Sequence, residues 1–313
     1  MSTPTLKIKQ PGILTTVQDR GRYGYQKLGV SVSGAMDEFA LRAANLIVGN
    51  HQNDAVIEMT ALGATIEALQ NTWIAITGAD MSPELDGRPI TRWKPFDVKM
   101  GSTLTFGNAQ NGMRTYLAMA GGVDVPLIMG SRSTDIKSRI GGLEGRELRI
   151  DDILYTLSSK LDSSPGNPTL PNIYELSNYG NHHEIRVILG PQYNAFSIPS
   201  IATLLNSDYI ISNHSDRMGY RLEGPIIEHQ ESPDIISDGN SLGSIQIAGD
   251  GLPNILLSDR GTTGGYTKIA TVISSDIGKL AQALPGQSIR FNAITVDQAH
   301  KILRERESIL TNL

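Results

Sequence analysis

Short runs in which hydrophobic and polar residues alternate, many of them β-branched, recur along the chain between turns rich in glycine and proline. Alternation with a period of two is typical of strands that bury one side. The pattern predicts strands at residues 6–10, 72–78, 102–107, 114–122, 184–190, 209–213, 244–249, 254–259, 269–274 and 288–293. We therefore expect a mainly β protein built as a sandwich or barrel.

Three longer stretches return apolar residues at intervals of three and four, which predicts helices at residues 35–49, 275–284 and 295–310. Asp37 and Glu38 stand near the start of the first stretch, and Arg304 and Arg306 near the end of the last. These charges suit the helix dipole. We expect the helices to cover barrel mouths and not to form a layer of their own.

Residues 155–184 are rich in Ser, Pro, Asn and Gly, which predicts a linker. The same motifs follow in the same order on either side of it: LKIKQPG and IRVILGP, DRGRYGYQKLG and SDRMGYRLEG, KMGSTLTFGNA and LPGQSIRFNA. We interpret this order as an internal duplication, with related β units at residues 1–154 and 185–313. Chance likeness between β-rich segments is the alternative. A duplication would let the paired loops face each other across a cleft.

The composition narrows the possible functions. A chain of 313 residues can bury a sizeable core, and a net charge of -5 argues against a nucleic-acid partner. The absence of cysteine excludes thiolate nucleophiles, cysteine-bound zinc and iron–sulfur clusters. No apolar run is long enough to span a membrane, and we expect a cytoplasmic protein without a membrane partner.

The loop that begins at Asp19 gathers candidate binding groups. Arg20 offers a planar fork for a carboxylate, phosphate or carbamate, and Tyr25 could donate to an oxyanion. Ser33 follows in the segment SVSGAMD, and the glycines between let backbone N–H groups approach a ligand. The alternative is a solvated hairpin in which Asp and Arg pair with each other.

The central segment and the second half carry further candidates. Hydroxyls around Arg132, including Ser133, suit an anion pocket, although Ser and Thr are also ordinary turn residues. A lysine after a Thr-Thr-Gly-Gly turn, such as Lys268, can hold an anion or transfer protons when it is partly buried. The phosphate-loop spacing G-x-x-x-x-G-K-[ST] is absent, and we assign no nucleotide site to this chain.

Two other kinds of site are disfavoured. His182 and His183 are adjacent, and on a strand they would point to opposite faces and could not easily share a metal. We expect no metal site. Acyl-enzyme chemistry is disfavoured because no serine lies in G-x-S-x-G.

Six longer motifs stand out in the chain: PGILTTVQDRGRYGYQKLGVSVSGAMDEFALRAANLIVGN, GGVDVPLIMGSRST, GGLEGREL, SDRMGYRLEGP, SDGNSLGSIQI and TTGGYTKIATVISSDIGKLAQALPGQSIRF. Together they resemble the biotin-dependent carboxyltransferase family, which includes the KipA-type proteins (allophanate hydrolase subunit 2), the C component of bacterial 5-oxoprolinase and the carboxyltransferase domain of urea carboxylase. They extend from about residue 5 to about residue 295. The resemblance implies two tandem cyclophilin-like β-barrel units.

The resemblance also implies a function. Free-standing bacterial members work with two partners, a KipI-like B component and a third, A component, as an ATP-dependent 5-oxoprolinase, which opens pyroglutamate to glutamate. On this hypothesis the catalytic residues are Asp19, Asp238, Asp259 and Lys268. The substrate-binding residues are Arg20, Tyr25, Ser33, Arg132, Ser133, Arg217, Tyr220, Thr262 and Thr263.

The chain departs from the family pattern at several positions. Gly261 stands where the family usually has Gln, and Thr267 where it has Pro; Asn53-Asp54 and Ile247-Ala248 replace Asn-Pro and Val-Pro. A biotinyl lysine would be expected within Met-Lys-Met, but the nearest text is DVKMG at 97–101. We therefore expect no covalent cofactor, with ATP used by the complex and biotin entering only on another protein.

Two alternative functions remain open. The chain could move CO2 from carboxybiotin to urea or a related amide, with a carboxylase and carrier in trans. It could instead be a KipA-type regulatory binding protein that antagonises a kinase inhibitor, and the loss of the motif glutamine gives this interpretation some weight.

Overall fold

The computed structural model describes residues 2–157, 165 and 178–313, which form two compact units. Unit 1 comprises the chain up to Tyr23, Ser33–Asn178 and Ser308–Leu313, and unit 2 comprises Gly24–Val32 and Tyr179–Glu307. The predicted units were continuous in sequence. In the structure residues 24–32, from the first half of the chain, belong to unit 2, and residues 308–313, from its end, belong to unit 1. Most of the predicted linker lies outside the described residues.

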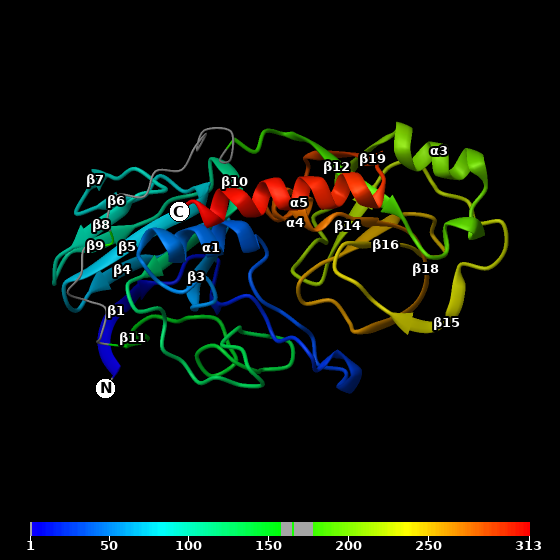
Figure 1. Ribbon diagram of the computed structural model, residues 1–313. Helices are drawn as coiled ribbons and strands as arrows, with labels where there is room; N and C mark the ends of the chain where they lie inside the picture. The colour runs from blue at the N-terminus through cyan, green and yellow to red at the C-terminus, as the bar shows by residue number, and fades with distance from the viewer. Residues whose placement is uncertain (1, 158–164, 166–177) are drawn as a thin grey trace. The chain divides into compact units, whose positions relative to one another are not determined.

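In its described residues, unit 1 contains two antiparallel sheets and helix α1 (Glu38–Ile47), together with the end of the last helix of the chain (Figure 1). Its strands are β1 (Ser2–Gln10), β2 (Leu14–Gln18), β3 (Val56–Thr60), β4 (Thr65–Ala68), β5 (Thr72–Asp80), β6 (Glu84–Leu85), β7 (Arg88–Pro89), β8 (Pro95–Val98), β9 (Thr103–Thr105), β10 (Asn111–Met119) and β11 (Ile153–Leu157). In the described part of the chain one sheet has the order β11-β1-β4-β9-β6-β7 and the other β2-β3-β10-β5-β8.

The alternating pattern explains how these sheets form a core. In β1, Leu6 and Ile8 are fully buried, while Lys7 and Lys9 form ion pairs with acidic side chains on the outside. Burial of such apolar side chains contributes about 1.5–3 kcal/mol each. The core cluster that contains Leu6 also takes side chains from both sheets, so the two sheets share one interior.

Helix α1 (Glu38–Ile47) packs on β5 and β10 of unit 1 (Figure 1). The carboxylate of Asp37 accepts a hydrogen bond of 3.1 Å from the N–H of Ala40, which caps the helix start. Alanines on the buried face of α1 allow the helix to lie close to the sheet. The sequence-based prediction of this helix is confirmed.

In the described residues of unit 2, seven strands close into a barrel. These seven are β12 (His182–Leu189), β13 (Asp208–Ile211), β14 (Gly219–Glu223), β16 (Ser244–Ile247), β17 (Pro253–Leu256), β18 (Thr263–Val272) and β19 (Ser288–Ala293), and an eighth strand, β15 (Asp234–Gly239), lies outside the ring. Their order is β12-β19-β13-β14-β17-β16-β18, and a β12–β18 pairing completes the ring, while β15 extends from β18. The predicted mainly β architecture is therefore confirmed.

The helices of unit 2 are α3 (Ile198–Asn206), α4 (Ser274–Gln282) and α5 (Val296–Thr311), and short 3-10 turns cover Gln26–Leu28 and Tyr193–Ala195. The predictions of α4 and α5 are confirmed, but α3 was missed. Its signals were a Ser197 cap, whose hydroxyl accepts from the N–H of Ser200, and Pro199 in the first turn. The last residues of α5 belong to unit 1, where Leu310 joins the core beside α1.

The two similar loops share one local feature. Asp19 accepts from the N–H of Gly21 at 2.8 Å, and Asp216 accepts from the N–H of Met218 at 2.7 Å, so each aspartate closes an Asx turn. The chain then differs, because the second loop enters β14 and the first does not enter a strand. The duplication stays a hypothesis, as does the predicted facing of the two loops. In the described residues no helix is long and apolar enough to cross a membrane.

Candidate active site

Asp19 is a buried acceptor at the centre of a polar cluster in unit 1. Its carboxylate accepts from the hydroxyls of Ser131 and Ser133 and from the N–H groups of Gly21 and Arg132, the last at 2.6 Å. These contacts join the first loop to the central glycine-rich segment, more than a hundred residues away. A carboxylate with four donors is well suited to fix loop geometry.

Arg20 and Arg132 are also engaged within unit 1. The guanidinium of Arg20 lies 2.8 Å from Oε1 of Glu38 and 3.0 Å from Oδ1 of Asn53. The Nε of Arg132 donates to the carbonyl of Val125 at 2.9 Å. The loop arginine therefore pairs with a carboxylate from α1 and not with its neighbour Asp19.

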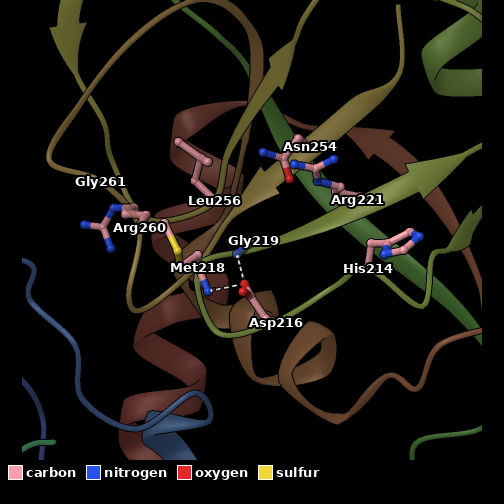
Figure 2. A pocket seen from close by; sticks show the side chains of 9 residues that line it. All are labelled: His214, Asp216, Met218, Gly219, Arg221, Asn254, Leu256, Arg260 and Gly261. Carbon is pink, nitrogen blue, oxygen red and sulfur yellow. Dashed lines mark hydrogen bonds between the residues drawn. The ribbon is translucent and has the colours of Figure 1, made fainter. Parts of the chain in front are cut away.

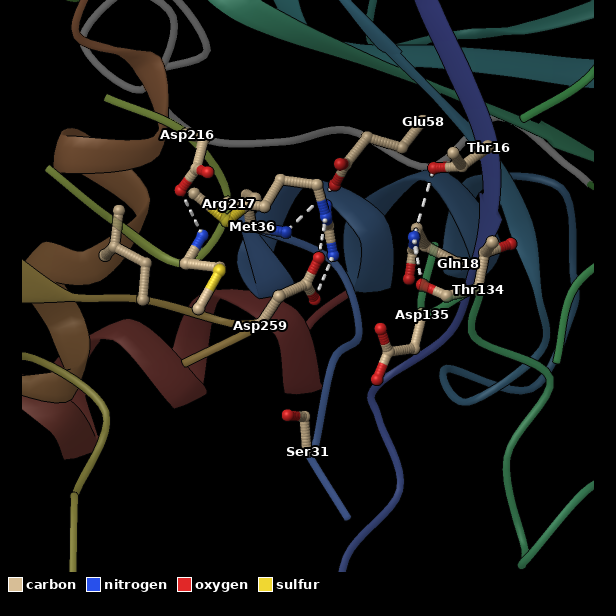
Figure 3. Close-up of polar contacts among 12 residues, drawn as sticks. Thr16, Gln18, Ser31, Met36, Glu58, Thr134, Asp135, Asp216, Arg217 and Asp259 are labelled. Carbon is tan, nitrogen blue, oxygen red and sulfur yellow. Dashed lines mark hydrogen bonds and ion pairs between the residues drawn. The ribbon is translucent and has the colours of Figure 1, made fainter. Parts of the chain in front are cut away.

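Two buried polar atoms near this cluster have no partner among the described residues. They are Oγ of Ser33, in a residue with φ of 54°, and Oε1 of Gln18. The amide nitrogen of Gln18 donates to Thr16 and to the carbonyl of Thr134, as Figure 3 shows. Unsatisfied buried groups are costly, so these acceptors mark places where a water or ligand atom would be favourable.

Arg217 and Asp259 form a bidentate ion pair in unit 2 (Figure 3). The Nε to Oδ2 distance is 2.8 Å and the Nη2 to Oδ1 distance is 3.1 Å, with both side chains largely buried. The parallel fork geometry is the strong form of this interaction. Tyr220, on the same segment, is buried and donates to the carbonyl of Ala283 at 3.3 Å.

Lys268 and Asp238 form another ion pair of unit 2, between β18 and β15. The Nζ to Oδ2 distance is 3.4 Å. The N–H of Gly239, followed by the charge of Lys268, holds the pKa of the Asp238 carboxyl below its usual value. This carboxylate is thus ionised at neutral pH and suited to accept hydrogen bonds.

Amide side chains surround this pair. The side-chain oxygen of Gln192 accepts from the backbone N–H of Lys268 at 3.1 Å. Gln246 lies opposite Lys268 on β16 and donates to Asn240 at 3.2 Å. The sequence-based site left out all three amides, although Asn240 and Gln246 lie inside the quoted motif SDGNSLGSIQI.

The Thr-Thr-Gly-Gly turn lies next to Asp238. The carbonyl of Thr262 accepts from the N–H of Asn240 at 2.9 Å, and Thr263 pairs with Gly239 in the β15–β18 register. Thr263 is exposed and Thr262 half-buried. The predicted residues Asp238, Thr262, Thr263 and Lys268 therefore lie in one part of unit 2.

Tyr25 belongs to the segment of the first loop that packs in unit 2. Its carbonyl accepts from the N–H of Leu28 at 2.9 Å. The hydroxyl of Ser31 donates to the carbonyl of Arg260 at 3.1 Å, which anchors the segment. Thus Tyr25 is part of unit 2, whereas Asp19, Arg20, Ser33, Arg132 and Ser133 are part of unit 1.

The described residues contain no group of three or more His, Asp or Glu side chains placed to hold a metal ion. His183 instead shares a hydrogen bond of 2.8 Å with Gln287, and burial lowers its pKa. Lys268 and Asp238 supply a fixed cation and an ionised carboxylate, with the hydroxyls of the neighbouring threonines beside them.

Comparison with known families matches residues 28–293 to the family described as carboxyltransferase domain, subdomain A and B. The chain belongs to this carboxyltransferase family. The resemblance inferred from the sequence motifs is confirmed, and the match contains the predicted site residues of unit 2 other than Tyr25.

Relatives of this carboxyltransferase-family chain differ in length. It is 40% identical to the 5-oxoprolinase C subunit of Escherichia coli over 98% of this chain and 97% of that protein. It is 34% identical to urea amidolyase of Saccharomyces cerevisiae over 98% of this chain but 18% of that protein. The crystal structure of Kluyveromyces lactis urea carboxylase covers the whole chain at 30% identity with a TM-score of 0.92, using 29% of that chain.

Two departures from the carboxyltransferase family pattern have clear structural settings. Gly261 is exposed, and a Cβ added there would meet only ordinary contacts, so the position has room for a side chain. Thr267 is buried, its N–H donates to the carbonyl of Pro233 at 3.1 Å, and its hydroxyl lies 2.9 Å from Nε2 of His229. Gly261 precedes and Thr267 follows the Thr-Thr-Gly-Gly turn that leads to Lys268.

Proposed function

We propose that this chain is the C component of an ATP-dependent 5-oxoprolinase, a hydrolase that opens 5-oxoproline to glutamate. The observation that carries this proposal is the end-to-end likeness to a 5-oxoprolinase C subunit, which covers 98% of this chain and 97% of the relative. The urea amidolyases match equally much of this chain but are several times longer. The proposal therefore rests on the relative that this chain matches over nearly its whole length.

The reaction breaks the lactam C–N bond and adds water, with OH going to the carbonyl carbon and a proton to the nitrogen. The transition state carries negative charge on the carbonyl oxygen. A fixed ammonium and hydroxyl donors stabilise such a charge. We assign this role to Lys268 with Thr262 and Thr263, which lie in one part of unit 2.

Asp238 has a different role in this proposal. Its lowered pKa makes it a weak proton donor at neutral pH, because the carboxyl stays ionised. It is therefore suited to orient the attacking water or the lactam N–H by accepting a hydrogen bond. Arg217 and Asp259, which pair with each other bidentately, act as positioning residues.

The proposal includes partners. ATP would be bound by a KipI-like B component or a third, A component, since this chain lacks a phosphate-loop spacing. We propose that this heteromeric complex is cytoplasmic. The clusters around Asp19 and Arg20 in unit 1 are candidates for holding loop geometry within it.

The test is ATP-dependent release of glutamate from 5-oxoproline by this chain with its B and A partners, omitting each component in turn. Activity that requires all three components supports the proposal. A stable complex with the B component that turns over no 5-oxoproline would contradict it and favour a regulatory binding protein.

A second candidate is carboxyl transfer from carboxybiotin to urea or a related amide. The observation that favours it is the likeness to urea carboxylase over the whole chain, with a TM-score of 0.92. The DVKMG segment lacks the Met-Lys-Met context, so biotin would arrive on another protein. Labelled CO2 appearing on urea, in the presence of a biotin carboxylase and carrier, would support this function.

A further inference from the structure

A pocket of about 420 Å³ opens on the outer wall of the unit 2 barrel (Figure 2). It is lined by β14, β17 and the turns beside them. On these strands Tyr220 and Ile255 are buried, so the alternate residues Arg221 and Asn254 point away from the barrel core. Neither Lys268 nor Asp238 lines this pocket.

Three polar side chains of the pocket have no partner among the residues that the structure describes: the guanidinium of Arg221, the amide of Asn254 and the imidazole of His214. The neighbouring arginines of the barrel behave differently. Arg186 and Arg290 each pair with an aspartate. The pocket therefore contains three side chains that can donate hydrogen bonds to a ligand.

Two of these groups, on Arg221 and Asn254, are held next to each other by the pairing of their strands. Arg221 and Asn254 lie directly opposite each other in the antiparallel β14–β17 register, which places such side chains on one face about 5 Å apart. Figure 2 shows their ends next to each other. A guanidinium fork binds the two oxygens of a carboxylate, and an amide N–H can donate to the same group.

Glycine at position 219 keeps this arrangement open. A Cβ at Gly219 would lie 2.9 Å from Oδ1 of Asn254 and would push that amide aside. On the opposite rim, Gly261 leaves space where the family usually has a glutamine. The backbone of both rims thus leaves the donors accessible.

Asp216 is the one carboxylate of the pocket. Its Oδ1 accepts from the N–H groups of Met218 and Gly219 at 2.7 and 3.2 Å, as Figure 2 shows, so it shapes the turn. Its negative charge would oppose an anion nearby. Removing this charge without losing the turn should therefore strengthen anion binding.

We propose that this pocket binds a small carboxylate through Arg221 and Asn254, with His214 as a further contact. The site goes beyond the proposed ring-opening function, because it stands on residues of unit 2 that this function does not use. Small carboxylates include 5-oxoproline and glutamate, which share an α-carboxylate. Glutamate also has a second carboxylate and a free ammonium where 5-oxoproline has a lactam.

The test is isothermal titration of the full chain with 5-oxoproline, with L-glutamate and with inorganic phosphate. We expect at least one carboxylate to bind. Arg221→Gln and Asn254→Ala should each weaken this binding, the arginine change by about tenfold or more because a charge-assisted contact is lost. Lys301→Gln, at a side chain 74% exposed on α5, is the matched control and should change nothing.

Asp216→Asn should change the affinity for the carboxylate in the opposite direction. Asparagine also closes Asx turns, so the turn is kept while the charge is removed, and affinity should rise several-fold. The proposal is overturned if no carboxylate binds the wild type, if phosphate binds equally well, or if Arg221→Gln and Asn254→Ala leave the affinity unchanged. Loss of binding in Lys268→Met alone would place the carboxylate at the ring-opening site instead.

Discussion

The ammonium of Lys268 lies 3.4 Å from Oδ2 of Asp238, and the two ends of this pair differ in exposure: the lysine side chain is 3% exposed and the aspartate side chain 58%. The cation is thus held in place by the barrel wall, while the anion reaches solvent. Such an arrangement keeps a positive charge fixed beside a carboxylate that a substrate can contact.

Replacing Lys268 with methionine should lower the ring-opening rate of the reconstituted complex by about 10²-fold or more, because a fixed charge at the developing oxyanion is lost. The pKa of the Asp238 carboxyl should also rise toward its usual value, since the lysine charge helps to lower it. Carboxyl NMR titration measures the pKa. Lys268→Arg, which keeps the charge, should retain more activity; a fully active methionine variant would refute the role of Lys268.

The ion pair of Arg217 and Asp259 should stabilise unit 2 more than an exposed pair does. Both side chains are largely buried, so Arg217→Met removes the bidentate partner of the Asp259 carboxylate and should cost about 3–5 kcal/mol of unfolding free energy. The control is Arg290→Met, whose partner Asp208 is about half exposed, and which should cost under about 1 kcal/mol. Urea unfolding compares the two; equal losses would contradict the argument.

Many of the strands and helices could be predicted from the local pattern of hydrophobic and polar residues. The predicted strands and helices follow from periods of two and of three to four residues, which depend on which face is buried. Helix α3 was not predicted, although Ser197 and Pro199 together are a helix start signal. A barrel was expected, but the pairing of β12 with β18 that closes it was not predicted, since strand register depends on partners far away in the chain.

The sequence indicated which residue types could form a site, but it did not indicate which residues form hydrogen bonds and ion pairs with each other. The sequence predicted a catalytic role for Asp19 and a substrate-binding role for Arg20, with pairing of the two as the alternative. In the structure Asp19 accepts hydrogen bonds from the segment around Ser133, and Arg20 contacts Glu38. Those partners are set by tertiary packing across as many as 114 residues. Gln192 was missed for the same reason, because its contact with Lys268 crosses between distant segments.

Removing Asp19 should destabilise unit 1. The carboxylate satisfies two hydroxyls and two backbone N–H groups, including that of Arg132, in a buried setting. Asp19→Ala leaves these donors without an acceptor and should cost about 3–5 kcal/mol, measured by denaturant unfolding. Asp19→Asn keeps one acceptor and should cost less; an alanine variant as stable as the wild type would show that the cluster carries no structural role.

Acid should weaken unit 2 through Asp276. Burial alone would raise the pKa of this carboxyl, but hydrogen bonds and charge from Arg186, together with Lys279, hold it below its usual value. A lowered folded pKa means that the stabilisation is complete above about pH 4 and is lost as pH falls through the folded value. Unfolding free energies measured against pH should fall over this range in the wild type and fall less steeply in Asp276→Asn.

Replacing Thr267 by the proline that the family usually carries there should destabilise unit 2. In this chain the Thr267 N–H donates to the carbonyl of Pro233, and its hydroxyl contacts His229. Thr267→Pro removes both interactions and should cost about 1–3 kcal/mol in urea unfolding. Thr267→Val keeps the N–H and nearly the same shape, so it isolates the hydroxyl and should cost about 1 kcal/mol. A proline variant as stable as the valine variant would mean that the bond to Pro233 adds nothing, and that the segment before Asp238 is positioned by other contacts.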